Sequence, residues 1–253
     1  MNSAPVRDFQ DFVGLIKDLD SSSELADSHI SLYPPIYEDL YSLYFHVRKS
    51  KVISILEYGS GWSTLALALG LSENFKLYGN YIKTNLRHPN AFQLMTVDAS
   101  EFFLKIATDR ARTVLPDGII PVLSKSRIIE YSGQICHVYR EVPNFTADLV
   151  YLDGPDANQV EGNYFGRGVD FGDQNKIYGL PMSADVLITE NFFWPGSKII
   201  VDGRGANARF ILNHLTRSWQ YEYDAALDQH LFTLNENAWG KYSKILLDFK
   251  EQY

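Results

Sequence analysis

The sequence predicts an α/β fold, in which a mostly parallel sheet is covered by helices on both faces. From Val52 onward, short apolar runs of strand length alternate with longer amphipathic stretches, and this alternation is typical of parallel strands joined by crossover helices. Four of the five main apolar runs end in an acid or place one just before the end. The chain has 253 residues and 45% hydrophobic content, enough to bury a full core. We therefore expect one α/β domain with an N-terminal helical extension.

The first fifty residues predict helices separated by a serine-rich break. Apolar residues recur at helical spacing in the stretches 6–19 and 34–49. Pro34 and Pro35 stand where the start of a helix tolerates proline. We expect residues 1–50 to form a helical cap on a main domain that spans residues 51–253.

The main domain divides into strands and helices in a regular order. The apolar runs predict strands at 52–58, 92–98, 118–123, 147–153 and 197–202. Helical spacing follows Ser100 and Ser183, and continues over residues 206–219. A Ser-Gly turn between alternating residues predicts a small hairpin at 128–139. Two further strands around Asp228-Gln229 are expected to form an antiparallel pair at the edge of the sheet.

Composition disfavours several classes of partner and location. A net charge of -8 and a pI near 5.2 argue against general binding of nucleic acid or of an anionic membrane surface. The single cysteine, Cys136, excludes an internal disulfide. The N-terminus has neither the basic nor the apolar region of a signal peptide, and no apolar run approaches the ~20 residues of a membrane span. We expect a cytoplasmic protein that binds neither nucleic acid nor membranes.

The stretch "ISILEYGSGWSTLALAL" has the composition of a strand, a glycine turn and a helix start. Glu57 ends the strand, Gly59 and Gly61 allow a tight turn and close approach of a ligand, and Ser63-Thr64 begin the helix. A glycine pair of this kind is also a common way to pack a helix against a strand. Thr64 stands where a dinucleotide fingerprint has Gly or Ala, which makes NAD the less favoured ligand.

The next strand ends in "TVDAS", which places Asp98 at the neighbouring strand end. A carboxylate in that position can accept hydrogen bonds from both hydroxyls of a ribose. The loop and Asp98 together suit a nucleotide-like ligand.

Four segments, "LEYGSGWST", "TVDAS", "ADLVYLDGPD" and "PGSKIIVDGRGANARF", resemble the class I S-adenosylmethionine-dependent methyltransferases. The resemblance covers roughly residues 50–235 and is greatest to bacterial O-methyltransferase-type proteins. It implies a Rossmann-like seven-stranded methyltransferase sheet and S-adenosylmethionine as the cofactor. The cofactor-binding residues it implies are Glu57, Gly59, Ser60, Gly61, Trp62, Ser63, Thr64, Asp98, Ala99 and Asp153. The segment from Asn74 to Asn90 is long for this fold.

The resemblance places Asp153 and Asp202 on neighbouring strand ends, facing the methyl acceptor. A carboxylate there can remove the proton of an acceptor hydroxyl directly, or through a divalent cation such as Mg²⁺ held by Asp153 and Asp202. Metal-dependent relatives have an Asp-Asn pair on the fifth strand, where this chain has Asp202-Gly203. His230 is a third catalytic candidate. Either Asp is equally well explained as a cap after a strand.

Other residues are weaker candidates. Arg204 and Asn207 are candidates to clamp an acceptor, whereas Glu190 on a helix is expected to be solvated surface. The tyrosines of the cap suggest either a lid over the acceptor or simple packing; they are Tyr33, Tyr37, Tyr41 and Tyr44.

The sequence therefore predicts a methyltransferase acting on a hydroxyl of a small-molecule or carbohydrate acceptor, and it allows a homodimer. The alternatives are a cofactor-binding protein of the same fold without turnover and, with less support, an NAD-dependent oxidoreductase. The identity of the acceptor does not follow from the fold, because caps and loops read it.

Overall fold

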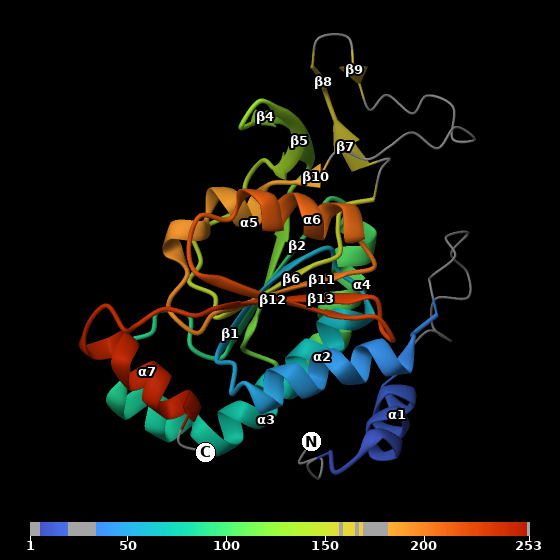
Figure 1. Cartoon of the computed structure of the whole chain (residues 1–253). Coiled ribbons are helices and arrows are strands. Elements are labelled where there is room, and N and C mark those ends of the chain that lie inside the picture. Colours follow the sequence, from blue (N-terminus) through green and yellow to red (C-terminus); the bar gives the residue numbers. More distant parts are fainter. Residues whose placement is uncertain (1–5, 20–33, 157–158, 165–166, 169–181, 252–253) are drawn as a thin grey trace.

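The computed structural model describes residues 6–19, 34–156, 159–164, 167–168 and 182–251. Its centre is a seven-stranded sheet in the order β12-β13-β11-β6-β1-β2-β3 (Figure 1). The strands are β1 (Ser54–Tyr58), β2 (Gln93–Asp98), β3 (Ile119–Leu123), β6 (Leu149–Leu152), β11 (Lys198–Asp202), β12 (Trp219–Asp224) and β13 (Gln229–Leu234). Adjacent pairs are parallel except where β13 pairs with β11 and β12. All five predicted strands and the antiparallel edge pair are confirmed.

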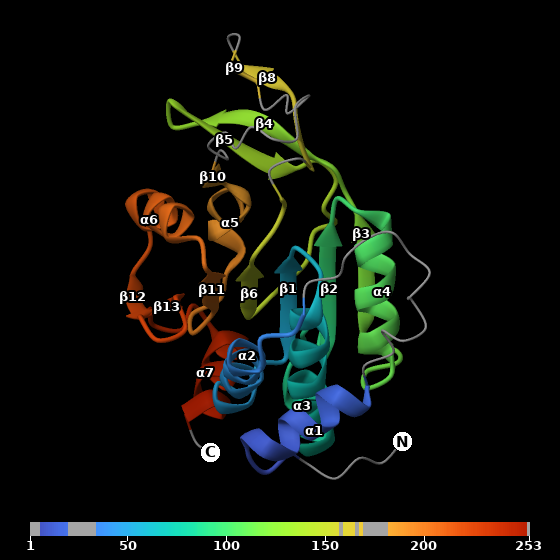
Figure 2. The same ribbon diagram turned by 90° about the vertical axis from the view of Figure 1, so that its right-hand side faces the viewer.

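Helices cover both faces of this sheet (Figures 1 and 2). They are α1 (Phe9–Asp18), α2 (Tyr37–Lys49), α3 (Trp62–Asn85), α4 (Glu101–Arg112), α5 (Asp185–Ile188), α6 (Gly205–His214) and α7 (Lys241–Glu251). One apolar core holds residues of α5 and α6 against one face of the sheet. A second core holds residues of α2, α3 and α7 against the other face. The β1 strand is buried along its whole length because both of its faces are covered.

Two predicted helices differ from the structure, and one helix of the structure was not predicted. The helix expected after Ser183 is one short turn, α5, followed by the 3₁₀ turn η3 (Glu190–Phe192). Its break lies at Thr189, whose hydroxyl donates to the backbone oxygen of Asp185 at 2.9 Å. The helix expected over 206–219 ends at His214, because the chain from Trp219 joins the sheet. The sequence pattern did not predict α7, which packs Leu246 and Phe249 into the second core.

The long segment from Asn74 to Asn90 is mostly a continuation of α3, which runs to Asn85. A buried asparagine holds this helix to α2 and to the chain that leads into β1: the Asn74 amide donates to the backbone oxygens of Val47 and Val52 at 3.0 and 2.8 Å. The extra length therefore leaves the strand ends where the fold requires them.

A smaller sheet lies beyond the carboxyl ends of the main strands (Figure 2). It consists of β10 (Met182–Ser183), β5 (Gln134–Tyr139), β4 (Ser126–Tyr131) and β7 (Val160–Glu161), and a two-stranded ribbon, β8 (Asn163–Tyr164) with β9 (Arg167–Gly168), adjoins it. The predicted hairpin is confirmed as β4 and β5. Its turn residues Ser132 and Gly133 both have positive φ, at 50° and 76°, as the favoured two-residue hairpin turn requires.

The described part of the N-terminal segment shares a core with the main domain. Phe12 and Ile16 of α1 pack with Leu40 and Tyr44 of α2 and with Leu65 of α3. Within the described residues, none of the helices is long and apolar enough to cross a membrane.

Candidate functional site

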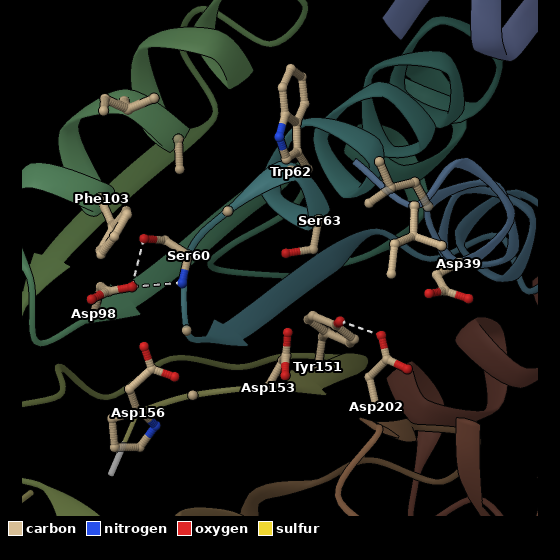
Figure 3. Close-up of a pocket in the computed structure, with 18 of the residues that line it drawn as sticks. Asp39, Ser60, Trp62, Ser63, Asp98, Phe103, Tyr151, Asp153, Asp156 and Asp202 are labelled. Carbon is tan, nitrogen blue, oxygen red and sulfur yellow. Dashed lines mark hydrogen bonds between the residues drawn. The ribbon is translucent and has the colours of Figure 1, made fainter. Parts of the chain in front are cut away.

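A cavity of about 360 Å³ opens at the carboxyl ends of β1, β2, β6 and β11 (Figure 3). The chain runs outward from β1 to β3 and then returns to build β6 and β11 on the other side of β1. Ligands of open α/β sheets bind at this point, where the strand order reverses. The walls also include the chain at the start of α2 and one face of α4.

Glu57 does not line the cavity; its buried side chain supports the loop between β1 and α3. Its fully buried carboxyl accepts the Ser63 hydroxyl at 2.6 Å and the Thr64 hydroxyl at 2.7 Å. The Thr64 Oγ1 in turn accepts the Gly61 backbone N–H at 3.1 Å. Burial raises the pKa of Glu57 to about 7, against the opposing effect of hydrogen bonds from Ser63, Thr96 and Thr64. Glu57 and Thr64 therefore hold the start of α3, and of the three only Ser63 borders the cavity.

The two glycines of this loop have different roles. Gly59 has a φ of +92°, and a Cβ there would lie 2.6 Å from the backbone nitrogen of Gly154, in the loop after β6. Gly61 has a φ of -176°, and the nearest atom to an added Cβ is the Ser63 hydroxyl at 4.0 Å. Gly59 is thus needed for the packing of two loops, whereas at Gly61 the space beside the backbone belongs to the cavity.

Asp98 lies at the end of β2 and binds the loop after β1. Its Oδ2 accepts the Ser60 backbone N–H at 2.8 Å and the Ser60 hydroxyl at 2.7 Å, and its Oδ1 accepts the Ser100 N–H at 2.7 Å. A carboxylate offers about four acceptor positions, so one remains for a ligand hydroxyl. Ala99, the next residue, packs against the core and does not line this cavity.

An aromatic and cationic wall faces the acids. The Arg110 guanidinium of α4 lies 3.8 Å from the centre of the Trp62 ring, a distance at which the ring attracts a cation. Phe103, Ile106 and Ala107 complete the side of α4 that borders the cavity. Except for Trp62, these residues were missed, although α4 begins directly after Asp98 and its first turns must lie at the same edge.

Asp153 lies in the loop after β6 and pairs with Arg204. The Arg204 Nε is 3.4 Å from the Asp153 Oδ1, and its other nitrogens donate to the backbone oxygens of Asp153 at 2.6 Å and of Pro155 at 3.1 Å. The Asp153 side chain is 50% exposed, but toward a recess. The surrounding protein raises the pKa of Asp153 to about 6 by desolvation, while Arg204 lowers it. Arg204 thus borders the cavity with its guanidinium bound to protein groups, and its role as an acceptor clamp stays a prediction.

Asp202 lies at the end of β11 and pairs with a tyrosine of the neighbouring strand. The Tyr151 hydroxyl donates to the Asp202 Oδ2 at 2.8 Å (Figure 3). Burial raises the pKa of Asp202, and the hydrogen bond from Tyr151 opposes that rise. Asp39, in the first turn of α2, borders the same end of the cavity; burial and the charge of Asp202 raise its pKa. Neither Tyr151 nor Asp39 was predicted, although Tyr151 lies two residues before Asp153, the spacing at which strand side chains share a face.

His230 does not line the cavity, and its predicted catalytic role is not supported. It pairs with Val201, one residue before Asp202, so its side chain lies on the other face of the sheet. There its Nδ1 is 2.8 Å from the Tyr221 hydroxyl, and its ring stacks on Tyr223 at 4.6 Å. Asn207 is also away from the cavity, where its Oδ1 accepts the Ser183 N–H at 2.7 Å.

The prediction for Glu190 as solvated surface is wrong. Its side chain is 5% exposed, and it accepts the N–H groups of Thr216 and Arg217 at 2.9 Å and the Trp219 Nε1 at 3.0 Å. The carboxylate thereby anchors the chain that enters β12. Its environment is a tertiary contact between segments 26 or more residues apart, which helical spacing does not reveal.

The tyrosines of the cap face other aromatic residues. The rings of Tyr41 and Tyr44 each lie 5.4 Å from that of Phe12, and the Tyr44 hydroxyl donates to Glu73 at 2.7 Å. Tyr37 packs against the same core, and Tyr33 lies outside the described residues. The N-terminal residues that border the cavity are instead Pro34, Ile36, Asp39 and Leu40.

In the described part of the chain, no three His, Cys, Asp or Glu side chains lie close enough together to hold a metal ion. The carboxyls of Asp153 and Asp202 instead have Arg204 and Tyr151 as partners. These two carboxyls therefore do not form the predicted magnesium site.

Comparison with solved structures finds methyltransferases. An O-methyltransferase of Bacillus cereus, solved with S-adenosylhomocysteine, is 14% identical, with 89% of this chain and 90% of that chain covered and a TM-score of 0.43. The O-methyltransferase TomG of Streptomyces achromogenes, solved with S-adenosylmethionine, is 12% identical, with 88% and 89% covered and a TM-score of 0.45. A methyltransferase of Geobacter sulfurreducens is 12% identical, with 93% and 92% covered and a TM-score of 0.47.

Similarity at these identities concerns the fold. No protein-family model and no curated protein sequence matches the chain. The structure has the seven-stranded sheet and the strand-end acids that the sequence motifs predict. In this sheet β13, next to the edge strand β12, is antiparallel to both of its neighbours. The solved structures to which the chain is similar are thus methyltransferases, two of them O-methyltransferases.

Proposed function

We propose that this protein is an S-adenosylmethionine-dependent methyltransferase that methylates a hydroxyl of a small molecule or a glycan. The observation that carries the proposal is the composition of the one cavity at the strand-order reversal. Gly61, Asp98, Asp153 and Asp202 all line it, and in Figure 3 Asp98 and Asp202 lie on opposite sides with Asp153 between them. A cofactor subsite and a proton-accepting subsite therefore adjoin each other within about 360 Å³, inside the usual range of small-molecule sites.

The residues present suit this cofactor. The space beside Gly61 admits a ligand against the backbone, and the remaining acceptor position of Asp98 suits a ribose hydroxyl. The carboxyls that border the cavity complement a positively charged sulfonium. When bound, S-adenosylmethionine supplies a methyl group activated by its attachment to that sulfonium.

The protein's own part in the reaction is to orient the acceptor and to take its proton. Asp153 and Asp202 both border the cavity, and both have a raised pKa. A base whose pKa lies nearer to neutral takes a hydroxyl proton more effectively than an ordinary carboxylate while still being ionised at pH 7. Holding donor and acceptor in line supplies the larger part of the rate.

The first turn of α2 and the residues before it are proposed to select the acceptor. Ile36, which is 62% exposed, and Leu40 offer an apolar surface, and Asp39 offers an acceptor for hydrogen bonds. This part of the cap is attached to the body through the Ser42 hydroxyl, which donates to Gln229 at 2.9 Å. The selecting element is thus a wall bearing Ile36 and Asp39, in place of a lid of tyrosines.

Calorimetry with S-adenosylmethionine and S-adenosylhomocysteine tests the proposal. We expect the wild type to bind both compounds, and Asp98→Ala to bind both at least about tenfold more weakly, because a hydrogen bond to a charged group contributes about 1.5–3 kcal/mol. Asp98→Asn, which keeps the shape, separates loss of the charge from disturbance of the loop. Asp109→Ala removes an exposed carboxyl of α4 outside the cavity and is the matched control.

Wild-type protein that is folded and binds neither compound would refute the proposal. Binding without transfer to any acceptor would favour a non-catalytic cofactor-binding protein. A ligand that binds only the folded state raises the melting temperature. We expect NAD not to bind and therefore to leave the melting temperature unchanged; a clear rise would favour the oxidoreductase alternative.

A further inference from the structure

The proposed function leaves two carboxylates, Asp153 and Asp202, as candidates for the base. Their surroundings differ in kind. The nearest partner of the Asp153 carboxylate is a cation, Arg204, at 3.4 Å, and half of the side chain is exposed. The Asp202 carboxylate accepts a hydrogen bond from a neutral group, the Tyr151 hydroxyl, at 2.8 Å, and the neutral Gln229 side chain also lowers its pKa.

The Tyr151–Asp202 contact follows from the register of two central strands. Tyr151 of β6 pairs with Ile200 of β11, and the two strands are parallel. Asp202 lies two residues beyond Ile200, so its side chain is on the same face as that of Tyr151. The tyrosine ring is 2% exposed and packs in the core of that face. Because its ring cannot move without disturbing that core, its hydroxyl oxygen marks a fixed point at the edge of the cavity.

The direction of this hydrogen bond is also determined. Burial raises the pKa of Tyr151 well above its usual value, and the charges of Asp153 and Asp202 raise it further. The hydroxyl therefore stays protonated and is the donor of the hydrogen bond to the Asp202 Oδ2. Together with the Gln229 side chain, which favours the ionised form of Asp202, this bond fixes the orientation of the carboxylate. A carboxylate offers about four acceptor positions, so it can still accept a substrate proton.

We propose that Tyr151 is a positioning residue that holds the Asp202 carboxylate as the base of the reaction, while Asp153 forms the ion pair that ties the β6 loop to Arg204. The inference rests on the proposed function. In the step concerned, the acceptor oxygen forms its bond to the transferred methyl group as the methyl–sulfur bond breaks. The hydroxyl proton passes to the Asp202 carboxylate, and the bond electrons return to sulfur, which becomes a neutral thioether.

A double-mutant cycle tests this assignment. Transfer is followed as release of S-adenosylhomocysteine with a panel of phenols and monosaccharides, and the fastest acceptor of the wild type is then used throughout. Tyr151→Phe is expected to lower kcat about tenfold with KM changed less than about twofold, which is the size of effect when an interaction with a charged group is lost from the transition state. In the Asp202→Asn background the same change is expected to cost less than about twofold, because the carboxylate it positions is gone. Asp153→Asn is expected to lose less rate than Asp202→Asn.

Tyr44→Phe is the matched control. It removes a buried tyrosine–carboxylate hydrogen bond of similar length, 2.7 Å to Glu73, between α2 and α3, and neither Tyr44 nor Glu73 lines the cavity. We expect it to leave kcat unchanged in both backgrounds. The same cycle is measured by urea unfolding, where Tyr151→Phe and Asp202→Asn are expected to lower the midpoint non-additively.

The possible outcomes separate the inference from the proposed function. Equal rate losses for Tyr151→Phe with and without Asp202→Asn would overturn the positioning role, as would coupling in the urea midpoint without coupling in kcat. A larger loss for Asp153→Asn would overturn the assignment of the base while leaving the methyltransferase intact. Failure of the wild type to bind S-adenosylmethionine would instead defeat the proposed function, and the urea cycle would still report whether Tyr151 holds Asp202.

Discussion

Alanine substitution is expected to have opposite effects at Gly59 and Gly61, the two glycines of the loop between β1 and α3. Alanine at position 59 is expected to destabilise the fold, and alanine at position 61 is expected to impair cofactor binding in a stable protein. The contrast follows from what an added methyl group meets. At Gly59 it meets the backbone of Gly154 at 2.6 Å, and at Gly61 it meets no atom closer than 4.0 Å.

The magnitudes can be worked from that geometry. Gly59→Ala must adopt a positive φ of 92°, which costs about 1–2 kcal/mol, and must also push apart two backbone segments, which costs about 1–3 kcal/mol. The expected loss in the free energy of unfolding is therefore about 2–5 kcal/mol. Gly61→Ala keeps an extended backbone and changes only a helix N-cap, so its loss is expected to be about 1 kcal/mol or less. Its methyl group, however, occupies space that we assign to the ligand.

Urea unfolding and calorimetry with S-adenosylmethionine measure the two effects on the same variants. We expect Gly61→Ala to unfold close to the wild type and to bind the cofactor about tenfold or more weakly. Gly133→Ala provides a control for the cost of positive φ alone, since its φ is 76° and no atom lies within 4 Å of its Cβ position. Normal cofactor binding by Gly61→Ala would refute the assignment of the subsite, and a Gly59→Ala loss no greater than that of Gly133→Ala would refute the role of packing against Gly154.

Two further predictions concern buried carboxyls. Burial raises the pKa of Glu57 from its ordinary 4.5 to about 7, so its protonated form favours the folded state. This contribution is complete below pH 4.5 and is lost as the pH rises through 7; it amounts to about 3 kcal/mol. Unfolding measured from pH 4.5 to 8 should therefore lose part of this pH dependence in Glu57→Gln, and identical curves for variant and wild type would contradict the reasoning. Burial alone would raise the pKa of Glu190, but the hydrogen bonds it accepts from Arg217, Thr216 and Trp219 lower it on balance. Its contribution is present above the ordinary pKa and is lost as the pH falls. Glu190→Gln should cost about 1–3 kcal/mol at pH 7 and less near pH 3, and a cost that is the same at both values would argue against a charged anchor.

Much of the fold is legible in the sequence because local chemistry determines it. A strand that is buried on both faces is rich in apolar residues, so β1 and β6 can be recognised without knowing their neighbours. The hairpin turn at Ser132-Gly133 is equally local, since two adjacent residues must both adopt positive φ. For the same reason the helix after Ser100 is predictable, because the Ser100 side chain caps it by accepting the Phe103 N–H.

Part of the candidate site is legible in the same way. Acids at the ends of parallel strands meet at one edge of the sheet whatever the loops do, and Asp98, Asp153 and Asp202 all border the cavity. The periodicity of a strand is 2, so position along the chain already indicates which face a side chain occupies. For β13 this rule places the His230 side chain on the face opposite that of Asp202, but only once the register between β13 and β11 is known.

Tertiary structure alone decided which groups these acids contact. Tyr151 and Asp202 are 51 residues apart, as are Asp153 and Arg204, and the first turn of α2 reaches the cavity from the far end of the chain. In the sequence Gly59 looks like a glycine that makes room for a ligand, but in the structure the space of its Cβ is occupied by the Gly154 backbone. A residue's type determines what it can bind, whereas its partner depends on which distant segment the folded chain brings within hydrogen-bonding distance. Strand positions and strand-end acids were therefore determined by the sequence itself, while packing decided which groups Glu57, Gly59 and Asp202 contact.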